Sequence, residues 1–230
     1  MGEKQIGRRC TEGKNRMKKL TITPSNMKIR TRIMLLYLLL SAILLTIQNE
    51  TEKMTRMITQ LLFLSRGYEG RLNFDPEEVS LYDMADSVSE ELAADAKKRA
   101  IKIHNRVPEE TVLTADQSLF TNLLVNLVGN AAKYGKEGGN VWIDAKAKDD
   151  DLSLTVTDDG IGISEEDIPH IFDRFYRADA ARGRSGSGLG LSICKWIVQM
   201  HGGTIRAESK AGEGTSFCVK MPLCPGSRKG

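Results

Sequence analysis

The chain has 230 residues, enough for one domain of good size plus an attachment but too few for a large multidomain machine. Its 40% hydrophobic and 27% charged content is typical of a folded globular protein and excludes a collagen-like or fully disordered chain. The net charge of +3 conceals an asymmetry, because residues 1–32 contain ten Lys and Arg against two Glu, which leaves 23 basic and 28 acidic residues in the remainder. This acidic remainder argues against nucleic-acid binding.

The four cysteines and three histidines show no metal-binding spacing. No C-x-x-C pair occurs, and Cys194 falls in an apolar helical pattern where a small buried thiol is expected, so we expect a reducing compartment. His104, His170 and His201 are scattered along the chain, and we expect no metal cluster of His and Cys.

Residues 33–47 form an uncharged apolar run of 15 residues. A helix of that length reaches about 22 Å, short of the roughly 30 Å hydrocarbon core of a bilayer. We expect membrane association through this run, while a signal-peptide core and a buried helix remain alternatives. The basic residues 1–32 should stay in the cytoplasm, so a single crossing would place everything after residue 48 outside.

A second helix is expected over residues 50–65, where apolar residues recur three or four apart from Met54 to Leu64 and form one stripe that needs a partner. Residues 73–76 read as a linker, which places a domain boundary near residue 72. The remaining sequence alternates helices with hairpins: helices at 83–99, 116–134 and 191–200, short strands at 101–103 and 112–113, and hairpins around 148–151 and 211–214. This order predicts an α+β fold in two layers, with helices on one face of a mixed, mostly antiparallel sheet.

Four polar residues share one face of the long helix, because Asn122, Asn126, Asn130 and Lys133 are spaced by 4, 4 and 3 residues. A solvated face is the alternative, but such a face normally carries Glu and Lys rather than Asn, a poorer helix former. An Asn carbonyl oxygen can coordinate Mg²⁺, and a Lys ammonium attracts phosphate. The row therefore favours a site for phosphate and a hard cation.

Two glycine-containing segments complete the pattern. Residues 158–163, DDGIGI, follow an alternating strand, where a carboxylate can accept a hydrogen bond from an exocyclic amine such as that of adenine and glycine leaves room for the base. An ordinary Asp-Gly turn is the alternative. Residues 183–191, GRSGSGLGL, directly precede a helix and form a candidate anion site, although they lack the Gly-Lys-Ser/Thr of a Walker A loop.

These segments resemble, in order, the N, G1, F and G2 boxes of the sensor histidine kinase catalytic domain: NLLVNLVGNAAKYG (122–135), DDGIGI (158–163), IFDRFYR (171–177) and GSGLGLSICKWIVQMHGG (186–203). The resemblance covers about residues 72–223 and implies the two-layer, Bergerat-type ATP-binding fold. Residues 54–66 resemble the second helix of the dimerisation and phosphotransfer hairpin in that family.

The resemblance implies ATP and Mg²⁺ as ligands, with Asn130 on Mg²⁺, Asn126 and Lys133 at the phosphates, Tyr134 stacked on adenine and Asp159 accepting the adenine amine. It assigns further contacts to the two glycine-containing segments, namely Gly160, Gly162, Ile163, Gly186, Ser187, Gly188, Leu189 and Gly190. Arg174 and Arg177 of the F box either reach the γ-phosphate or are ordinary surface arginines. Residues 173–190 would form a mobile lid hinged on glycine.

The motif with the phospho-acceptor histidine of this family has no counterpart in the sequence, because none of the three histidines lies in an acceptor's context. An internally deleted or truncated sensor kinase would explain the missing acceptor motif. It would also explain why a single membrane crossing would put an ATP-binding domain outside the cytoplasm. The expected division is a basic tail (1–32), an apolar segment (33–47), a remnant of the second hairpin helix with a linker (48–71), the ATP-binding domain (72–224) and a tail (225–230).

The expected function is ATP-dependent phosphorylation of a histidine, acting in trans, followed by transfer to a response regulator. The expected partners are a receiver domain of that regulator and an intact kinase or a second copy of the chain. The expected location is the bacterial inner membrane, with the catalytic domain in the cytoplasm. A nucleotide-binding regulator that pairs with an intact kinase is the alternative, and an ATP-driven clamp of the gyrase or Hsp90 type would need a transducer domain that the length does not accommodate.

Overall fold

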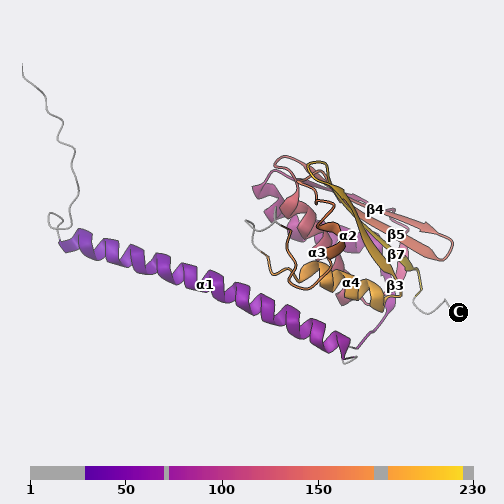
Figure 1. Cartoon of the computed structure of the whole chain (residues 1–230), viewed down its shortest axis with the longest axis horizontal. Helices are drawn as coiled ribbons and strands as arrows, with labels where there is room; N and C mark the ends of the chain where they lie inside the picture. The colour runs from indigo at the N-terminus through magenta and orange to yellow at the C-terminus, as the bar shows by residue number, and fades with distance from the viewer. Residues whose placement is uncertain (1–28, 70–72, 179–185, 225–230) are drawn as a thin grey trace, which may run out of the picture. The chain divides into compact units, whose positions relative to one another are not determined.

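A computed structural model describes residues 29–69, 73–178 and 186–224 (Figure 1). The chain divides into two compact units, Met1–Lys53 and Met54–Gly230. Helix α1 (Ile29–Tyr68) is continuous for 40 residues, whereas the sequence predicted two helices. No Gly or Pro interrupts residues 48–50, so nothing there stops the helix. Within it, Thr31–Gly67 is long and apolar enough to cross a membrane, judged by length and composition alone.

The second unit alternates helices and strands as the sequence predicted. Its elements are β1 (Glu77–Ser80), α2 (Leu81–Lys98), β2 (Lys102–Arg106), β3 (Val112–Ala115), α3 (Gln117–Tyr134), β4 (Asn140–Lys148), β5 (Asp151–Asp158), the 3₁₀ turn η2 (Ile168–His170), α4 (Gly190–Met200), β6 (Thr204–Lys210) and β7 (Gly214–Pro222). Between β5 and α4, the described residues form only this short 3₁₀ turn. Strand β1 was not expected from the sequence.

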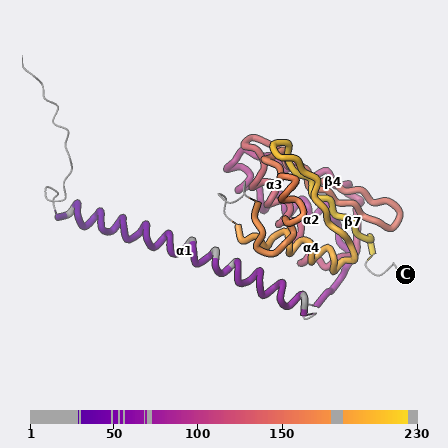
Figure 2. The backbone as a smooth tube through the Cα atoms, in the orientation of Figure 1, coloured from indigo at the N-terminus to yellow at the C-terminus, as the bar shows by residue number. Residues whose placement is uncertain are grey.

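Five strands form the main sheet in the order β2-β4-β5-β7-β6. Only the pair of β2 and β4 is parallel, and the other three pairs are antiparallel, which confirms the mixed, mostly antiparallel sheet. Strands β1 and β3 pair separately as a two-stranded antiparallel sheet. Figure 2 shows α2, α3 and α4 gathered on one side of β4 and β7, so the predicted two-layer α+β architecture is confirmed.

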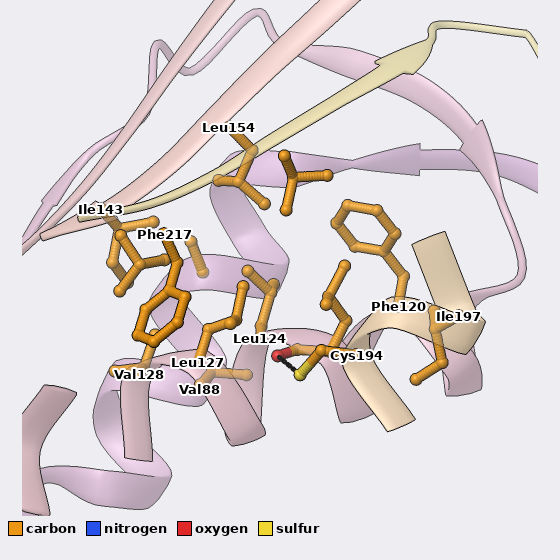
Figure 3. Close-up of a cluster of buried hydrophobic side chains, with 14 of the residues drawn as sticks. Val88, Phe120, Leu124, Leu127, Val128, Ile143, Leu154, Cys194, Ile197 and Phe217 are labelled. Carbon is orange, nitrogen blue, oxygen red and sulfur yellow. Dashed lines mark hydrogen bonds between the residues drawn. The ribbon is translucent and has the colours of Figure 1, made fainter. Parts of the chain in front are cut away.

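The core lies between this helical layer and the sheet (Figure 3). Strand side chains such as Ile143, Leu154 and Phe217 meet helical side chains such as Leu124 and Ile197, and all five are less than 5% exposed. Cys194 is also fully buried, as its apolar pattern predicts, and burial raises the pKa of its thiol well above the usual range. Burial of this continuous apolar layer fixes which face of each element points inward.

The second unit also includes the end of α1. Most of the predicted stripe is exposed, including Met54, Ile58 and Leu62. The last residue of that stripe, Leu64, is only 1% exposed, and the neighbouring Phe63 ring meets the Trp196 ring edge to face with centroids 5.2 Å apart, so the end of α1 packs on α4.

Candidate functional site

Helix α3 carries the polar row and is fixed at its start by Asp116. The Asp116 carboxylate accepts a hydrogen bond from the Leu119 N–H at 3.0 Å, which caps the helix. The leucine face of α3 is buried in the core, while Asn122, Asn126, Asn130 and Lys133 are half-buried. The row therefore lies beside the core rather than within it, where a ligand can reach it.

The carboxamide of Asn126 is held in one orientation. Its Nδ2 donates hydrogen bonds to the Asn122 carbonyl oxygen at 2.9 Å and to Asn122 Oδ1 at 2.5 Å. Its Oδ1 lies against Gly190, where an added Cβ would come within 2.7 Å of that oxygen. Asn122 thus engages the donor end of Asn126, and the acceptor end faces the start of α4.

Lys133 connects the other end of the row to the glycine-rich loop. Its Nζ lies 4.8 Å from the centre of the Tyr134 ring, a cation–π contact. A Cβ added at Gly186 would come within 2.8 Å of the same Nζ. The segment 186–190 therefore approaches the α3 row at both of its ends. Gly186 lies near Lys133, and Gly190 lies near Asn126, seven residues earlier on α3.

Asp158 is the last residue of β5 and is only 4% exposed. It continues the inward-facing series Leu152, Leu154 and Val156, which are all fully buried. Its carboxylate accepts the Gly160 N–H at 2.8 Å. Burial raises its pKa to about 6, with the neighbouring Asp159 adding to the rise and the Gly160 hydrogen bond opposing it.

The family resemblance implies that Asp159 accepts the adenine amine, and in the structure its carboxylate binds the start of β4. Both of its oxygens accept the Asn140 N–H, each at 3.1 Å, at the start of β4. The two neighbouring carboxylates therefore differ, since Asp158 points into the interior and Asp159 joins two strands. Period-two alternation along β5 is the signal that identifies Asp158 from the sequence.

The segment that follows Asp158 needs its glycines for close approach and for turning. A Cβ at Gly160 would run into the Tyr134 carbonyl oxygen and the Asp158 carboxylate. Gly162 has a φ of 65° and lies against the Lys210 backbone. Ile163 is half-buried against the core. The end of α3 and the DDGIGI segment are thus in direct contact.

The glycine-rich loop is anchored at several points. Leu189 is fully buried, so its side chain anchors the loop in the core, and Gly190 is the first residue of α4. The Gly188 carbonyl oxygen accepts the Phe175 N–H at 2.9 Å. Ser187 Oγ donates a hydrogen bond to Gln60 Oε1 of α1 at 2.8 Å.

The F-box arginines differ in exposure, since Arg174 is exposed and Arg177 is half-buried. The middle of the expected lid, residues 179–185, lies outside the described residues. Upstream, Ser164 and Asp167 bind each other: the Asp167 N–H donates to Ser164 Oγ at 3.2 Å, and Ser164 Oγ donates to Asp167 Oδ2 at 2.7 Å. The expected contact of Arg174 and Arg177 with the γ-phosphate stays a prediction.

Three segments lie in contact: the polar row of α3, the glycine-containing segment that follows the buried Asp158, and the loop before α4. A family model described as histidine kinase-, DNA gyrase B-, and HSP90-like ATPase matches residues 115–225, which contain all three. Sensor histidine kinase WalK of Bacillus subtilis is 37% identical over 183 residues, an alignment that covers 78% of this chain and 30% of WalK. The chain spans 30 to 38% of the length of WalK and YclK, two curated relatives from that organism.

Solved structures share the fold of the second unit. The catalytic domain of histidine kinase ThkA, in a nucleotide-free form, matches with a TM-score of 0.60 and 28% identity, over 67% of this chain and 99% of that domain. ThkA in complex with the response regulator protein TrrA matches with a TM-score of 0.63 and 25% identity, over 93% of this chain and 56% of that one. These neighbours confirm a histidine kinase catalytic fold.

Proposed function

Because residues 115–225 belong to the histidine kinase-, DNA gyrase B- and HSP90-like ATPase family, and the chain is homologous to sensor histidine kinases, we propose that it binds ATP with Mg²⁺ and phosphorylates a histidine. The observation that carries the proposal is the convergence of the three segments. Lys133 and Asn126 of α3 face the loop 186–190, and Tyr134 of the same helix contacts Gly160. A cationic side chain, amide oxygens and a buried carboxylate thus surround one site.

Asp158 is the residue we assign to the adenine amine, in place of Asp159. Its burial and its position beside Gly160 support this role, because a desolvated carboxylate accepts a hydrogen bond strongly and the missing Cβ leaves room for a base. Asp159 then acts on the protein itself, by holding the Asn140 N–H. Tyr134, Gly162 and Ile163 complete the surroundings of the base.

The phosphates are assigned to the opposite part of the site. Lys133 supplies a positive charge, and the N-terminus of α4 after the glycine-rich loop supplies backbone N–H groups for an anion. Asn130 offers an amide oxygen of the kind that binds Mg²⁺, and Asn126 lies one turn earlier on the same face. Mg²⁺, when bound, neutralises charge on the phosphates.

The phosphoryl group is proposed to pass to a histidine on another chain and then to the receiver domain of a response regulator. Two of the three histidines here are engaged in the fold. His201 is fully buried between the Asp116 N–H and the Ile197 carbonyl oxygen, and His104 Nε2 lies 2.8 Å from Asn140 Oδ1. His170 is exposed but pairs with Asp173.

A membrane location is proposed for α1. The large apolar side chains of residues 33–47 are exposed, and the helix is long enough to span a bilayer by length and composition. We place the kinase domain in the cytoplasm of a bacterium, where ATP is available. Because the basic residues 1–32 should also stay in the cytoplasm, we propose that residues 33–47 associate with the membrane without making a single crossing. Flotation of the chain with vesicles, against a variant in which Leu36, Leu39 and Leu40 are replaced by Asn, tests this assignment.

The test of the function is a titration of the purified full chain with a fluorescent ATP analogue and Mg²⁺, run beside incubation with γ-labelled ATP. We expect saturable binding that Asn130→Asp weakens, because a carboxylate there adds negative charge beside the phosphates. Acid-labile label should appear on an added histidine-containing kinase hairpin and not on this chain alone. A chain that binds no ATP would refute the proposal.

The regulator without catalytic activity remains the second candidate, favoured by the missing acceptor motif. The same assay separates the two functions. Tight ATP binding with no label on any added histidine-bearing hairpin would support the regulator. Label on this chain that His170→Gln abolishes would instead identify an acceptor within it.

A further inference from the structure

Backbone carbonyl oxygens in the last turn of α3 accept hydrogen bonds from the side chain of Arg99, which directly follows α2. An α-helix leaves its last four carbonyl oxygens without an intrahelical partner. In α3, the Ala131 oxygen accepts the Gly135 N–H at 2.8 Å, and the Tyr134 oxygen accepts the Ile161 N–H at 3.2 Å. The two carbonyls between them need a donor from outside the helix.

Arg99 supplies that donor. Its Nη1 donates to the Ala132 oxygen at 2.7 Å and to the Lys133 oxygen at 2.5 Å, and its Nη2 donates to the Gly135 oxygen at 2.8 Å. The guanidinium is planar and carries its donors in a fixed fork, so three carbonyls bound to it have little freedom to move relative to one another. Its positive charge also meets the negative end of the α3 dipole.

The backbone of Arg99 holds the segment that follows α3. Its carbonyl oxygen accepts the Gly138 N–H at 2.9 Å. Arg99, which lies 33 to 36 positions earlier in the chain than the carbonyls it binds, therefore holds both the last turn of α3 and the connection from α3 to β4.

The turn that Arg99 holds is the turn that carries Lys133 and Tyr134. The Tyr134 carbonyl oxygen in turn binds Ile161 and lies where a Gly160 side chain would have to fit. A shift of this turn would thus move the ammonium at the glycine-rich loop, the ring beside it and the segment after Asp158 together.

From this arrangement we propose that Arg99 is a positioning residue for nucleotide binding, which sets the last turn of α3 and through it the base pocket and the Lys133 ammonium. The inference rests on the proposed ATP site. Arg99 is assigned no contact with the nucleotide, and it acts through the carbonyls it binds. A displacement of binding groups by even about 1 Å is enough to cost a large factor in affinity or rate.

The experiment compares Arg99→Met, Arg99→Lys and the control Lys98→Met in the full chain. Lys98 is the adjacent residue, its side chain is 73% exposed, and its ammonium pairs with Asp95, so the control removes the same charge from the same helix end. Each variant is titrated with a fluorescent ATP analogue and with the corresponding GTP analogue at a temperature where tryptophan fluorescence shows it to be folded.

We expect the ATP dissociation constant to rise about tenfold in folded Arg99→Met and the preference for ATP over GTP to fall, with Lys98→Met unchanged. Arg99→Lys should lie between, because an ammonium cannot span three carbonyls as the fork does. A merely structural role would lower the folded fraction and leave the ATP dissociation constant of the folded protein unchanged.

The proposal is overturned by folded Arg99→Met that binds ATP within twofold of the wild type. If Arg99→Met does not fold, ATP binding by folded Arg99→Lys within twofold of the wild type overturns the proposal instead. If neither variant folds, Arg99 serves general stability, and the proposal is also overturned. A wild-type chain that binds no ATP refutes the proposed function itself, and the positioning role falls with it.

Discussion

Replacing Asp158 by Asn should stabilise the fold at neutral pH while weakening recognition of ATP. The carboxylate is buried and its pKa is raised from 3.8 to about 6, so its ionised form disfavours the folded state. At 1.36 kcal/mol for each pKa unit, ionisation of Asp158 costs the folded state about 3 kcal/mol. Asn has nearly the same shape, can still accept the Gly160 N–H and carries no charge to desolvate.

The sign follows from proton linkage. Between the unfolded pKa of 3.8 and the folded pKa of about 6, the folded state binds more protons than the unfolded state, so this contribution to stability is present at low pH and is lost as the pH rises through 6. Of the total, about 1.4 kcal/mol is lost between pH 5 and pH 8. Asp158→Asn lacks this loss. The difference in free energy of unfolding between Asp158→Asn and the wild type should therefore be about 1.4 kcal/mol larger at pH 8 than at pH 5.

Urea unfolding at pH 5 and pH 8 measures the effect. Both tryptophans of the chain, Trp142 and Trp196, lie in the second unit, so their fluorescence reports its unfolding. Asp159→Asn is the matched control, because it keeps the buried carboxylate and should keep most of the wild-type pH dependence. If the free energy of unfolding changes by the same amount from pH 5 to pH 8 in the wild type and in Asp158→Asn, the assignment of a buried, destabilising charge to Asp158 is refuted.

Further expectations concern binding, packing and the end of α1. ATP affinity should fall as the pH drops through about 6, where Asp158 becomes protonated, and a titration series showing constant affinity from pH 7.5 to pH 5.5 would contradict this. Leu124→Ala should cost about 2–5 kcal/mol in urea unfolding, because the side chain is fully buried. Gly160→Ala should abolish ATP-analogue binding, since its methyl group meets backbone atoms; retained affinity would count against the pocket. Gly67→Ala should detach the end of α1 from α4 and speed proteolysis within residues 60–69, whereas Gly129→Ala, with nothing within 4 Å of the added carbon, should not.

Local periodicity was enough to predict the architecture and the shared face of the α3 row. Repeats of three and four residues defined the buried side of α3, and alternation defined β5, because a helix and a strand each fix the direction of a side chain from its position in the chain. The same alternation carries Asp158 inward with Leu152, Leu154 and Val156. This alternation is the sequence signal on which the proposed role of Asp158 depends.

The sequence pattern predicted two helices where the structure has the single helix α1. Polar residues 48–50 separate two apolar stripes, but polarity alone does not end a helix without a Gly, a Pro or a capping side chain. The exposed Met54 and the buried Leu64 belong to the same predicted stripe, and only tertiary contacts decide which part of it is covered.

The amino-acid sequence determined the element types, the two-layer fold and the glycine and asparagine segments of the site, because these depend on neighbours close along the chain. Tertiary structure alone decided which segments meet: Arg99 with the end of α3, Lys133 with Gly186, and Gln60 with Ser187, 127 residues away. Such contacts depend on how faces pack across the core, and no local pattern records the distance between two segments once the chain has folded.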